Sequence, residues 1–282
     1  MNQKFEIARD PYFDLSRCVT SGQVFRWQRE DDIWTGYEGE NLYRIEMTEY
    51  GLSVETNASQ RDFENLFRLD WNAEKVEADI IERGPELALP AQELRGLRLL
   101  RPSSAEETFF TFLCTANNHL SRIGTMVRAL AAYGDEDRFP SVDRIAAIDP
   151  LELRAKKFGY RADSIVLSAR QLQGRGPDWL DTLRTVEYET AFNELLLLRG
   201  VGPKLADCIC LFGLDHTEAV PVDTHIWQQI VRHYRPDWAD KSLTLGRYRD
   251  AGAVVRDRFG EHAGWAQQIL FYDNLLNWRT RG

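Results

Sequence analysis

The sequence has few cysteines and no spacing of side chains that is typical of a metal site. Among its 282 residues there are four cysteines: Cys18, Cys114, Cys208 and Cys210. Cys208 and Cys210 lie two positions apart on an expected helix, so their side chains diverge and no disulfide between them is expected. These absences predict a protein that carries no metal and works in a reducing intracellular compartment.

The sequence also lacks long apolar runs, internal repeats and low-complexity segments. No run approaches the roughly 18 apolar residues of a membrane span, so no membrane association is expected. The first residues, Met1 to Glu6, resemble neither a secretory signal nor a transit peptide. With 43% hydrophobic and 28% charged residues, the composition is that of a soluble globular protein with one large or two modest domains.

An excess of basic charge is absent too, because the formal net charge is −9. Taken alone, this value argues against a nucleic-acid partner. The acidic residues, however, are concentrated between Gln28 and Thr56, where two arginines stand among eight acids. The eight acids are Glu30, Asp31, Asp32, Glu38, Glu40, Glu46, Glu49 and Glu55. The remainder of the chain is close to neutral, which leaves room for a local basic surface with a modest, salt-sensitive affinity for nucleic acid.

The first hundred residues predict a mixed structure of strands and helices. Runs rich in Val, Ile, Tyr and Trp, separated by turn residues, predict strands. These are Val24 to Gln28, Trp34 to Tyr37, Leu42 to Met47 and Leu52 to Glu55. Apolar residues at helical spacing then predict helices at Gln60 to Arg68 and Glu74 to Glu82.

From Ser104 onward the pattern is almost wholly helical. Helices are expected at Ala105 to Cys114, Leu120 to Tyr133, Val142 to Ile148, Pro150 to Lys157, Ala162 to Leu172, Trp179 to Thr185, Tyr188 to Leu198, Pro203 to Gly213, Thr224 to Tyr234, Leu245 to Phe259 and Ala263 to Trp278. The best joint is Leu99 to Ser103, which contains Pro102. We therefore predict two domains, residues 1–102 and 103–282, and allow the last helix to pack back on the first domain.

The segment from Leu195 to Ile226 carries the strongest chemical signal. Its Gly200-Val201-Gly202 turn joins an apolar helix end to a helix that begins at Pro203. Two glycines permit a backbone with positive φ, and Pro suits the first position of a helix. The backbone amides here and the positive end of the new helix favour an anion such as phosphate. Lys204 lies in this first turn, where the helix field favours its neutral, nucleophilic form.

About twenty residues later the chain reads Val220-Pro221-Val222-Asp223-Thr224-His225. Together with the Gly200 turn and Lys204, this segment resembles the helix-hairpin-helix DNA glycosylase superfamily, and within it the 8-oxoguanine DNA glycosylase/AP lyase branch. The resemblance implies that Lys204 is the nucleophile, that Asp223 stabilises the developing sugar cation, and that His225 contacts a phosphate. From the residues alone, Lys204 is equally a phosphate contact, Asp223 a helix cap and His225 a surface histidine.

The resemblance also implies a pocket for a flipped base. Gln267 and Phe271, four apart on the last expected helix, share a face and offer an amide edge and an aromatic plane. Ser21-Gly22-Gln23-Val24-Phe25-Arg26-Trp27 resembles the branch's Ser-Gly-Gln-x-Phe-Arg-Trp segment, in which the glycine supplies a carbonyl to the lesion. Cys208 and Pro221 complete the expected pocket. Core packing of Phe271 and Cys208 and a plain turn at Gly22 are the alternatives.

Two further segments resemble parts of the family that contact DNA. Asn117-Asn118-His119-Leu120-Ser121-Arg122 resembles its Asn-Asn-Asn-x-x-Arg motif. The resemblance implies that Asn117 fills the space left by the flipped base and that Arg122 contacts the opposite base. Tyr160 and Arg161 resemble a wedging tyrosine and a second base-contacting arginine. The backbone of Gly200 and Gly202 completes the DNA-binding set, and turn asparagines and surface arginines are the alternatives.

The resemblance extends from Gly22 to Phe271, with three departures. Arg199 stands where the motif often has proline, which predicts a looser start of the hairpin. His119 replaces a third asparagine, and Phe212 replaces a smaller side chain at the pocket edge. None of these changes removes a group with an expected catalytic role.

These patterns predict an α+β protein with an N-terminal antiparallel β-sheet domain and a larger all-α helix-hairpin-helix glycosylase domain. The implied activity is removal of 8-oxoguanine opposite cytosine from double-stranded DNA, by base flipping, a Schiff base on the lysine and β-elimination. No cofactor is expected, and the protein is expected to be a monomer. It is expected in the cytoplasm at the nucleoid of a prokaryote, or in the nucleus of a eukaryote.

Three other interpretations are weaker. Iron–sulfur members of the superfamily need a four-cysteine cluster near the C-terminus, and no cysteine follows Cys210. The monofunctional alkylpurine branch works without the lysine. A DNA-damage sensor without turnover needs neither Asp223 nor the pair of Gln267 and Phe271.

Overall fold

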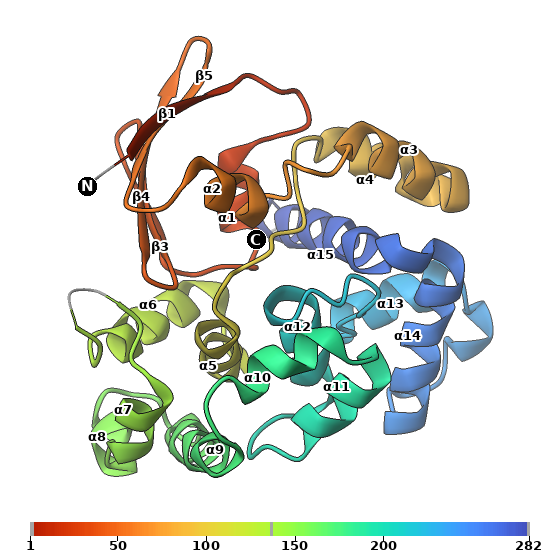
Figure 1. Cartoon of the computed structure of the whole chain (residues 1–282). Helices are drawn as coiled ribbons and strands as arrows, with labels where there is room; N and C mark the ends of the chain where they lie inside the picture. The colour runs from red at the N-terminus through yellow and green to blue at the C-terminus, as the bar shows by residue number, and fades with distance from the viewer. Residues whose placement is uncertain (1–2, 136–137, 281–282) are drawn as a thin grey trace.

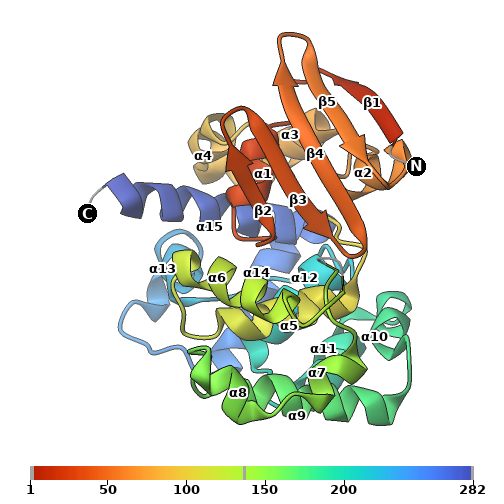
Figure 2. The same ribbon diagram turned by 90° about the vertical axis from the view of Figure 1, so that its left-hand side faces the viewer.

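The computed structural model describes residues 3–135 and 138–280, and it places a β-sheet against a larger assembly of helices (Figures 1 and 2). The sheet has five antiparallel strands in the order β1-β5-β4-β3-β2. Their bounds are β1 (Gln3–Ala8), β2 (Trp27–Glu30), β3 (Ile33–Glu38), β4 (Asn41–Thr48) and β5 (Gly51–Thr56). The expected antiparallel N-terminal sheet and the mainly helical remainder are therefore confirmed.

The strands predicted from the runs of branched and aromatic residues are present, with two corrections. The strand expected at Val24 to Gln28 is displaced and begins at Trp27. Strand β1 was not predicted, because it is a short, mostly exposed strand of mixed polarity. It is stabilised by pairing with β5, in a register that joins Gln3 to Thr56 and Ala8 to Gly51. Such pairing partners far along the chain leave no local pattern.

The N-terminal segment contains short helices besides the sheet. They are α1 (Leu15–Thr20), α2 (Gln60–Leu66), α3 (Ala73–Arg83), η1 (Pro85–Leu87) and α4 (Ala88–Glu93). Helix α2 begins with a capping box, in which the Ser59 and Asp62 side chains each bond the other residue's backbone. Helices α2 and α3 confirm the two predicted helices of this segment, whereas α1 and α4 are too short to show a clear periodicity.

The helices after residue 104 follow the predicted order. They are α5 (Ala105–Thr115), α6 (Leu120–Ala131), α7 (Val142–Ala147), α8 (Pro150–Ala155), α9 (Arg161–Arg175), α10 (Trp179–Thr182), η2 (Leu183–Thr185), α11 (Tyr188–Leu196), α12 (Pro203–Gly213), α13 (Thr224–His233), η3 (Pro236–Trp238), α14 (Leu245–Phe259), η4 (Gly260–His262) and α15 (Ala263–Thr280). Helices α12 and α14 have the predicted bounds, and the others differ by a few residues at their ends, where helices fray.

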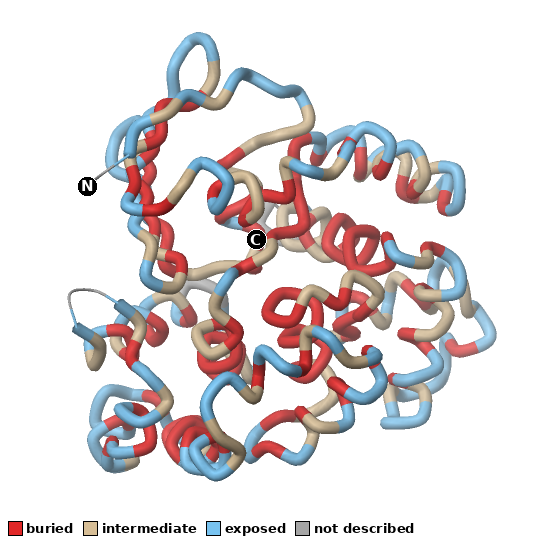
Figure 3. The backbone as a smooth tube through the Cα atoms, viewed as in Figure 1, coloured by how far each residue is buried: buried red, intermediate tan, exposed pale blue. Residues whose placement is uncertain are grey.

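Two hydrophobic cores run through the molecule, as the buried positions in Figure 3 illustrate. The smaller core lies under the sheet and includes Phe63, Phe67 and Trp27, whose ring stacks on Tyr43 at 5.9 Å. The larger core joins α3 and α4 to the later helices. The chain passes between the cores more than once, because residues from Ala73 to Leu99 belong to the larger core and Leu100 belongs to the smaller one. The predicted domain boundary at residue 102 therefore stays a prediction.

The contact between the sheet and the helices is built around two glutamates, Glu38, which is buried, and Glu107, whose side chain is 12% exposed. Arg26 donates two hydrogen bonds to Glu107 of α5, both at 3.1 Å. Glu38 at the end of β3 accepts hydrogen bonds from the backbone N–H and the hydroxyl of Ser103. Burial raises the pKa of Glu107 to about 7, although the Arg26 ion pair opposes this shift. These bonds fix the predicted Leu99–Ser103 joint as a rigid contact.

Three further findings concern the described residues. All four cysteines are buried and free, in agreement with the expectation for Cys208 and Cys210. No described helix is long and apolar enough to span a membrane. Within residues 3–135 and 138–280, no group of three or more His, Cys, Asp or Glu side chains is arranged to hold a metal ion.

Candidate active site

The turn between α11 and α12 depends on Gly200 more than on Gly202. Gly200 has a φ of +84°, and a Cβ atom there would lie 2.5 Å from the side chain of Ser164. Gly202 has an extended backbone, with a φ of −101°, and a Cβ atom there would meet open space. The expectation that both glycines serve positive φ is therefore corrected to Gly200 alone. Pro203 occupies the first turn of α12, as predicted.

The backbone of Arg199, at the start of this turn, is held by a side chain from another helix. Its backbone N–H, which a proline would lack, donates to Oε1 of Gln171 on α9 at 2.7 Å. The amide nitrogen of the same Gln171 side chain donates to the carbonyl of Leu197 at 3.2 Å. A side chain from a different helix thus holds the backbone on both sides of this position, and the looser start stays a prediction.

Lys204, Cys208 and Asp223 lie together at the open end of α12. Burial raises the pKa of the Cys208 thiol to about 11. The amine of Lys204 opposes this shift through its charge and a side-chain hydrogen bond, and the more distant Asp223 carboxylate adds to it. Cys208 is buried, whereas Lys204 and Asp223 are partly exposed. The thiol is therefore a neutral wall of the site, and the amine and the carboxylate remain accessible.

Asp223 is both a helix cap and an accessible carboxylate. Its Oδ1 accepts the backbone N–H groups of His225 at 2.9 Å and Ile226 at 2.8 Å, which caps α13. Within residues 3–135 and 138–280, its Oδ2 has no hydrogen-bond partner. One oxygen thus fixes the carboxylate at the positive end of α13, and the other is free to face a substrate. The two interpretations of Asp223 that the sequence left open are compatible.

Gln267 on α15 lies behind the same loop. Its side chain is buried, and its Nε2 donates to the carbonyl of Pro221 at 3.1 Å. Its Oε1 is buried and has no partner among the described residues. A buried, unpaired acceptor is costly, and a ligand that donates a hydrogen bond to it would relieve the cost. Phe271, one turn later, is partly buried and packs at the edge of the core.

The loop that carries Gly22 is held against α15 by residues that the sequence did not single out. Gly22 has a φ of +85°. The carbonyl of Ser21, just before it, accepts from Nε2 of Gln268 at 3.0 Å. The hydroxyls of Thr20 and Tyr272 lie 2.9 Å apart. Gln268 and Tyr272 each follow a predicted pocket residue by one position, so α15 presents one face to the pocket and a neighbouring face to the Gly22 loop.

The buried side chain of Gln23 also holds this loop in place. The side-chain amide of Gln23 donates to the carbonyl of Arg98, and its Oε1 accepts the backbone N–H of Leu100, both at 2.9 Å. Gln23 belongs to the motif that the sequence identified, but its partners lie about 75 positions away. The structure therefore explains this motif as an anchored turn that sets the position of Gly22.

The Asn117 turn between α5 and α6 rests on Arg161. Asn117 has a φ of +45° and is exposed. Arg161 is buried, and its guanidinium donates to the carbonyls of Ala116 and Asn117, the latter at 2.7 Å. Tyr160 is exposed, and its hydroxyl donates to the carbonyl of Ala116 at 3.1 Å. In this structure Arg161 supports the turn from within, so its expected contact with the opposite base stays a prediction.

The remaining predicted DNA contacts are exposed. Arg122 donates to the carbonyl of Lys157 at 2.7 Å, which holds α6 beside the turn before Tyr160. His225 is exposed on the first turn of α13. His119 is exposed and serves as the residue before α6 without a side-chain cap. Phe212 points inward and stacks on Phe112 at 5.3 Å, so its ring belongs to the core.

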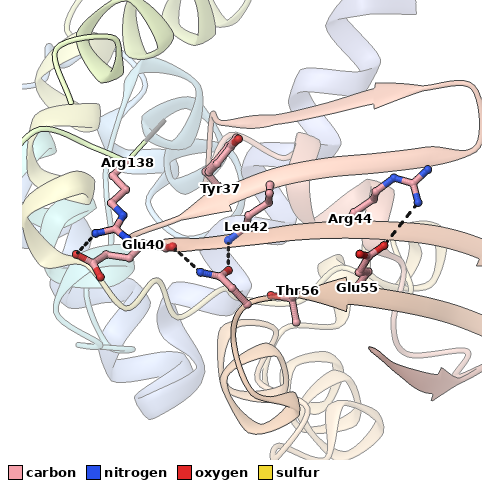
Figure 4. Close-up of a pocket in the computed structure, with 8 residues that line it drawn as sticks. Tyr37, Glu40, Leu42, Arg44, Glu55, Thr56 and Arg138 are labelled. Atoms are coloured by element: carbon pink, nitrogen blue, oxygen red, sulfur yellow. Dashed lines mark hydrogen bonds and ion pairs between the residues drawn. The ribbon is translucent and has the colours of Figure 1, made fainter. Parts of the chain in front are cut away.

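The acidic segment is kept away from these groups. All eight acids between Gln28 and Thr56 lie on β2 to β5 or on the turns between these strands. A pocket on this sheet, shown in Figure 4, pairs Glu40 with Arg138 and Glu55 with Arg44. None of the predicted site residues lines it. The negative net charge is therefore compatible with DNA contact by the helices.

Comparisons with known proteins agree with this geometry. Residues 6–107 match the family model described as 8-oxoguanine DNA glycosylase, N-terminal domain. The fold is that of a solved structure of MBOgg1 in complex with a low-affinity DNA ligand, with a TM-score of 0.85 and 24% identity over 97% of this chain and 96% of that one. It is also that of the Clostridium acetobutylicum 8-oxoguanine glycosylase/lyase in complex with double-stranded DNA containing cytosine opposite 8-oxoguanine, with a TM-score of 0.84 and 23% identity over 98% of both chains. The fold is thus that of a DNA glycosylase.

One curated relative shows which DNA glycosylase family this is. The N-glycosylase/DNA lyase OGG1 of Arabidopsis thaliana is 35% identical over 287 residues, which cover 94% of this chain and 78% of the plant protein. The chain therefore belongs to the 8-oxoguanine DNA glycosylase family of bifunctional N-glycosylase/DNA lyases. It is an enzyme of DNA base-excision repair.

Proposed function

We propose that this enzyme removes 8-oxoguanine paired with cytosine from double-stranded DNA and cleaves the strand through a Schiff base on Lys204. The observation that carries the proposal is the arrangement around one short loop. Lys204 and Asp223 both influence the Cys208 thiol, Asp223 keeps one oxygen free, and Gln267, whose other amide atom is an unpaired acceptor, holds the carbonyl of Pro221 two residues before Asp223. The structure of the Clostridium acetobutylicum 8-oxoguanine glycosylase/lyase contains double-stranded DNA with cytosine opposite 8-oxoguanine.

The chemistry follows from the amine and the carboxylate. The neutral Lys204 amine attacks the sugar C1′, and the electron pair of the glycosidic bond leaves with the base. The ionised Asp223 stabilises the positive charge that develops on the sugar. The bond between C1′ and the ring oxygen of the sugar then breaks, which leaves a Schiff base between C1′ and the lysine nitrogen. Removal of a C2′ proton then allows β-elimination of the 3′ phosphate. This sequence of steps uses no metal or organic cofactor.

Selection of the damaged base has a hydrogen-bonding basis. Oxidation converts N7 of guanine from an acceptor into an N–H donor. The carbonyl of Gly22, on its anchored turn, would accept a hydrogen bond from this N–H. Normal guanine would instead place two acceptors face to face. The unpaired Oε1 of Gln267 suits the N1–H and amino donors of a guanine edge. Phe271 and Cys208 supply apolar walls beside these polar groups.

The DNA duplex would lie across the helical face of the protein. The amides of Gly200 and Gly202 and the exposed His225 would contact the phosphates of the damaged strand. Asn117, Arg122 and Tyr160 would occupy the gap and contact the opposite base. We further propose that the protein acts as a monomer, without a membrane partner, in the cytoplasm of a prokaryote or the nucleus of a eukaryote.

Borohydride trapping tests this function directly. The wild type and Lys204→Gln are incubated with a duplex that contains one 8-oxoguanine opposite cytosine, and reduction converts a Schiff base into a stable adduct. A covalent adduct with the wild type alone supports lesion, nucleophile and intermediate together. Base release without any adduct would contradict the role of Lys204. Absence of both adduct and base release would contradict the choice of lesion, which trapping on preformed abasic DNA then separates from a loss of lyase chemistry.

A further inference from the structure

A buried carboxylate lies directly beneath the catalytic loop. Asp207 of α12 is almost fully buried, three residues after Lys204. The hydroxyl of Tyr188 on α11 donates to its Oδ1 at 2.5 Å, and the hydroxyl of Tyr248 on α14 donates to its Oδ2. A single carboxylate therefore joins three helices through two charge-assisted hydrogen bonds of the same chemical type.

The two tyrosines differ in what else they hold. The oxygen of Tyr188 accepts from Nη1 of Arg256, on the far side of the network, at 3.3 Å. The oxygen of Tyr248 accepts the backbone N–H of Val222 at 3.3 Å. Only the Tyr248 branch therefore reaches the loop of the active site. The hydrogen bonds of the Tyr188 hydroxyl go to α12 and α14, and the contact of its ring with His216 is preserved in a phenylalanine.

Val222 is the point at which this network can affect chemistry. It directly precedes Asp223, whose Oδ1 caps α13. It directly follows Pro221, whose carbonyl is held by Gln267. The backbone between the base pocket and the catalytic carboxylate is thus fixed at its middle by Tyr248. The same Asp207 belongs to the helix that carries Lys204, so the network connects the nucleophile's helix to the loop of its partner.

We propose that Tyr248 and Asp207 are positioning residues, which hold Asp223 at the correct distance from the sugar. Neither side chain touches the substrate in this proposal. It rests on the proposed function only in that Asp223 acts at C1′. A carboxylate that is misplaced by a fraction of an ångström still allows DNA to bind but stabilises the transition state less.

The test compares Tyr248→Phe with Tyr188→Phe. Each variant removes one hydroxyl from Asp207 and preserves the ring, but only the first frees the Val222 N–H. For Tyr248→Phe we expect the single-turnover rate of base excision to fall about 10-fold, with the Kd for an uncleavable abasic analogue unchanged within about twofold. For Tyr188→Phe we expect both quantities to stay within about twofold of the wild type.

Two results would overturn the proposal. Equal rates for both variants would mean that the network contributes to folding alone. A rise in Kd with an unchanged rate would place Tyr248 in DNA binding. Thermal unfolding measures the folded fraction, and Asp207→Asn is the second variant if Tyr248→Phe does not fold. If neither variant folds while Tyr188→Phe does, the network is required for folding and the positioning role is wrong.

The wild type in the same assay separates this inference from the proposed function. If the wild type does not release 8-oxoguanine, the proposed substrate is wrong. The variants are then compared by Schiff-base trapping on preformed abasic DNA, in which Lys204 and the same loop still meet C1′. A selective loss for Tyr248→Phe in that assay supports the positioning role independently of the lesion.

Discussion

The two sides of the proposed pocket are assembled in different ways. The side that carries Lys204 and Asp223 comes from one continuous segment, residues 200–226, in which two helix starts meet. The side that carries Gly22 joins the N-terminal segment to α15, through hydrogen bonds such as that of Ser21 with Gln268, 247 positions apart. Figure 1 shows α15 passing from the helical part toward α1, the helix that precedes the Gly22 loop in the chain.

This difference separates chemistry from recognition. In the segment with Lys204 and Asp223, both helix starts have a local cause, Pro203 and the Asp223 cap. Tyr248 and Gln267 add distant support to the loop between them. The Gly22 loop has local hydrogen bonds through Ser21, but its position relative to α15 depends on the distant bonds of Gln268 and Thr20. We therefore expect substitutions on the first side to affect all substrates, and substitutions on the second side to affect the damaged base alone.

The largest effect is expected for Lys204→Gln. Without an amine the enzyme forms no Schiff base, so strand cleavage at a preformed abasic site should fall by at least about 10³-fold. Quantification of cleaved strand on a denaturing gel measures this. Lys157→Gln, in the turn before Tyr160, is the matched control and should keep nearly full activity. Cleavage by Lys204→Gln at a tenth of the wild-type rate would exclude Lys204 as the nucleophile.

Asp223→Asn should have the next largest effect. The amide oxygen can still accept the N–H groups of His225 and Ile226, so the cap of α13 is retained, but the negative charge is lost. We expect base excision to slow about 100-fold, because the sugar cation loses its stabilisation. Single-turnover kinetics measure the rate, and circular dichroism checks that the helix content is unchanged. A loss below about threefold would show that Asp223 is only a cap.

Gln268→Ala tests the recognition side. The Ser21 carbonyl loses its partner, so the Gly22 loop should be less well positioned, and excision of 8-oxoguanine should slow about 10-fold. Cleavage at a preformed abasic site, measured with the same protein, should stay within about twofold. Tyr272→Phe loosens the Thr20 contact, further from Gly22, and should show a smaller loss in the same direction. Equal losses in both assays would contradict the separation of the two sides.

Glu107, at the contact between sheet and helices, is expected to affect the pH dependence of stability, with little effect on the rate of either reaction. Burial raises its pKa to about 7 in the folded protein, from an ordinary value of 4.5. Between these two pH values the folded state holds a proton that the unfolded chain releases, so stability falls as the pH rises from 4.5 to 7. Glu107→Gln should remove up to about 3 kcal/mol of this pH dependence.

Urea unfolding at a series of pH values measures the effect of Glu107→Gln. Glu49→Gln, in the exposed turn between β4 and β5, is the control and should leave the pH dependence unchanged. A variant that keeps the wild-type slope between pH 4.5 and 7 would show that the ion pair with Arg26 keeps Glu107 ionised.

Much of the helical architecture was predictable from the sequence because it has a local cause. Pro203 at a helix start, Asp223 as a cap and apolar residues at helical spacing each act within one or two turns. The bounds of α12 and α14 were therefore predicted correctly. The segment with Lys204 and Asp223 also has the predicted turn and helix starts, whereas the catalytic roles of the two residues stay a prediction.

The features that the sequence did not reveal have a common physical reason as well. Strand β1 forms only because β5 offers it hydrogen-bonding partners. Arg199 is tolerated at the hairpin because Gln171, on another helix, binds its N–H. Asp207 has the pattern of an ordinary buried residue until Tyr188 and Tyr248 are seen to share it. Each of these depends on a partner far away in the chain.

The sequence by itself thus determined the fold class, the order of the helices and the segment that carries Lys204 and Asp223. Only the tertiary structure decided how Gly22 is held against α15, why Gln267 presents an unpaired oxygen, and which tyrosine supports the catalytic loop. The reason is the range of the forces. Helix caps and backbone conformations act between neighbours in the chain, whereas buried polar groups are satisfied by whichever partner the packing brings within about 3 Å.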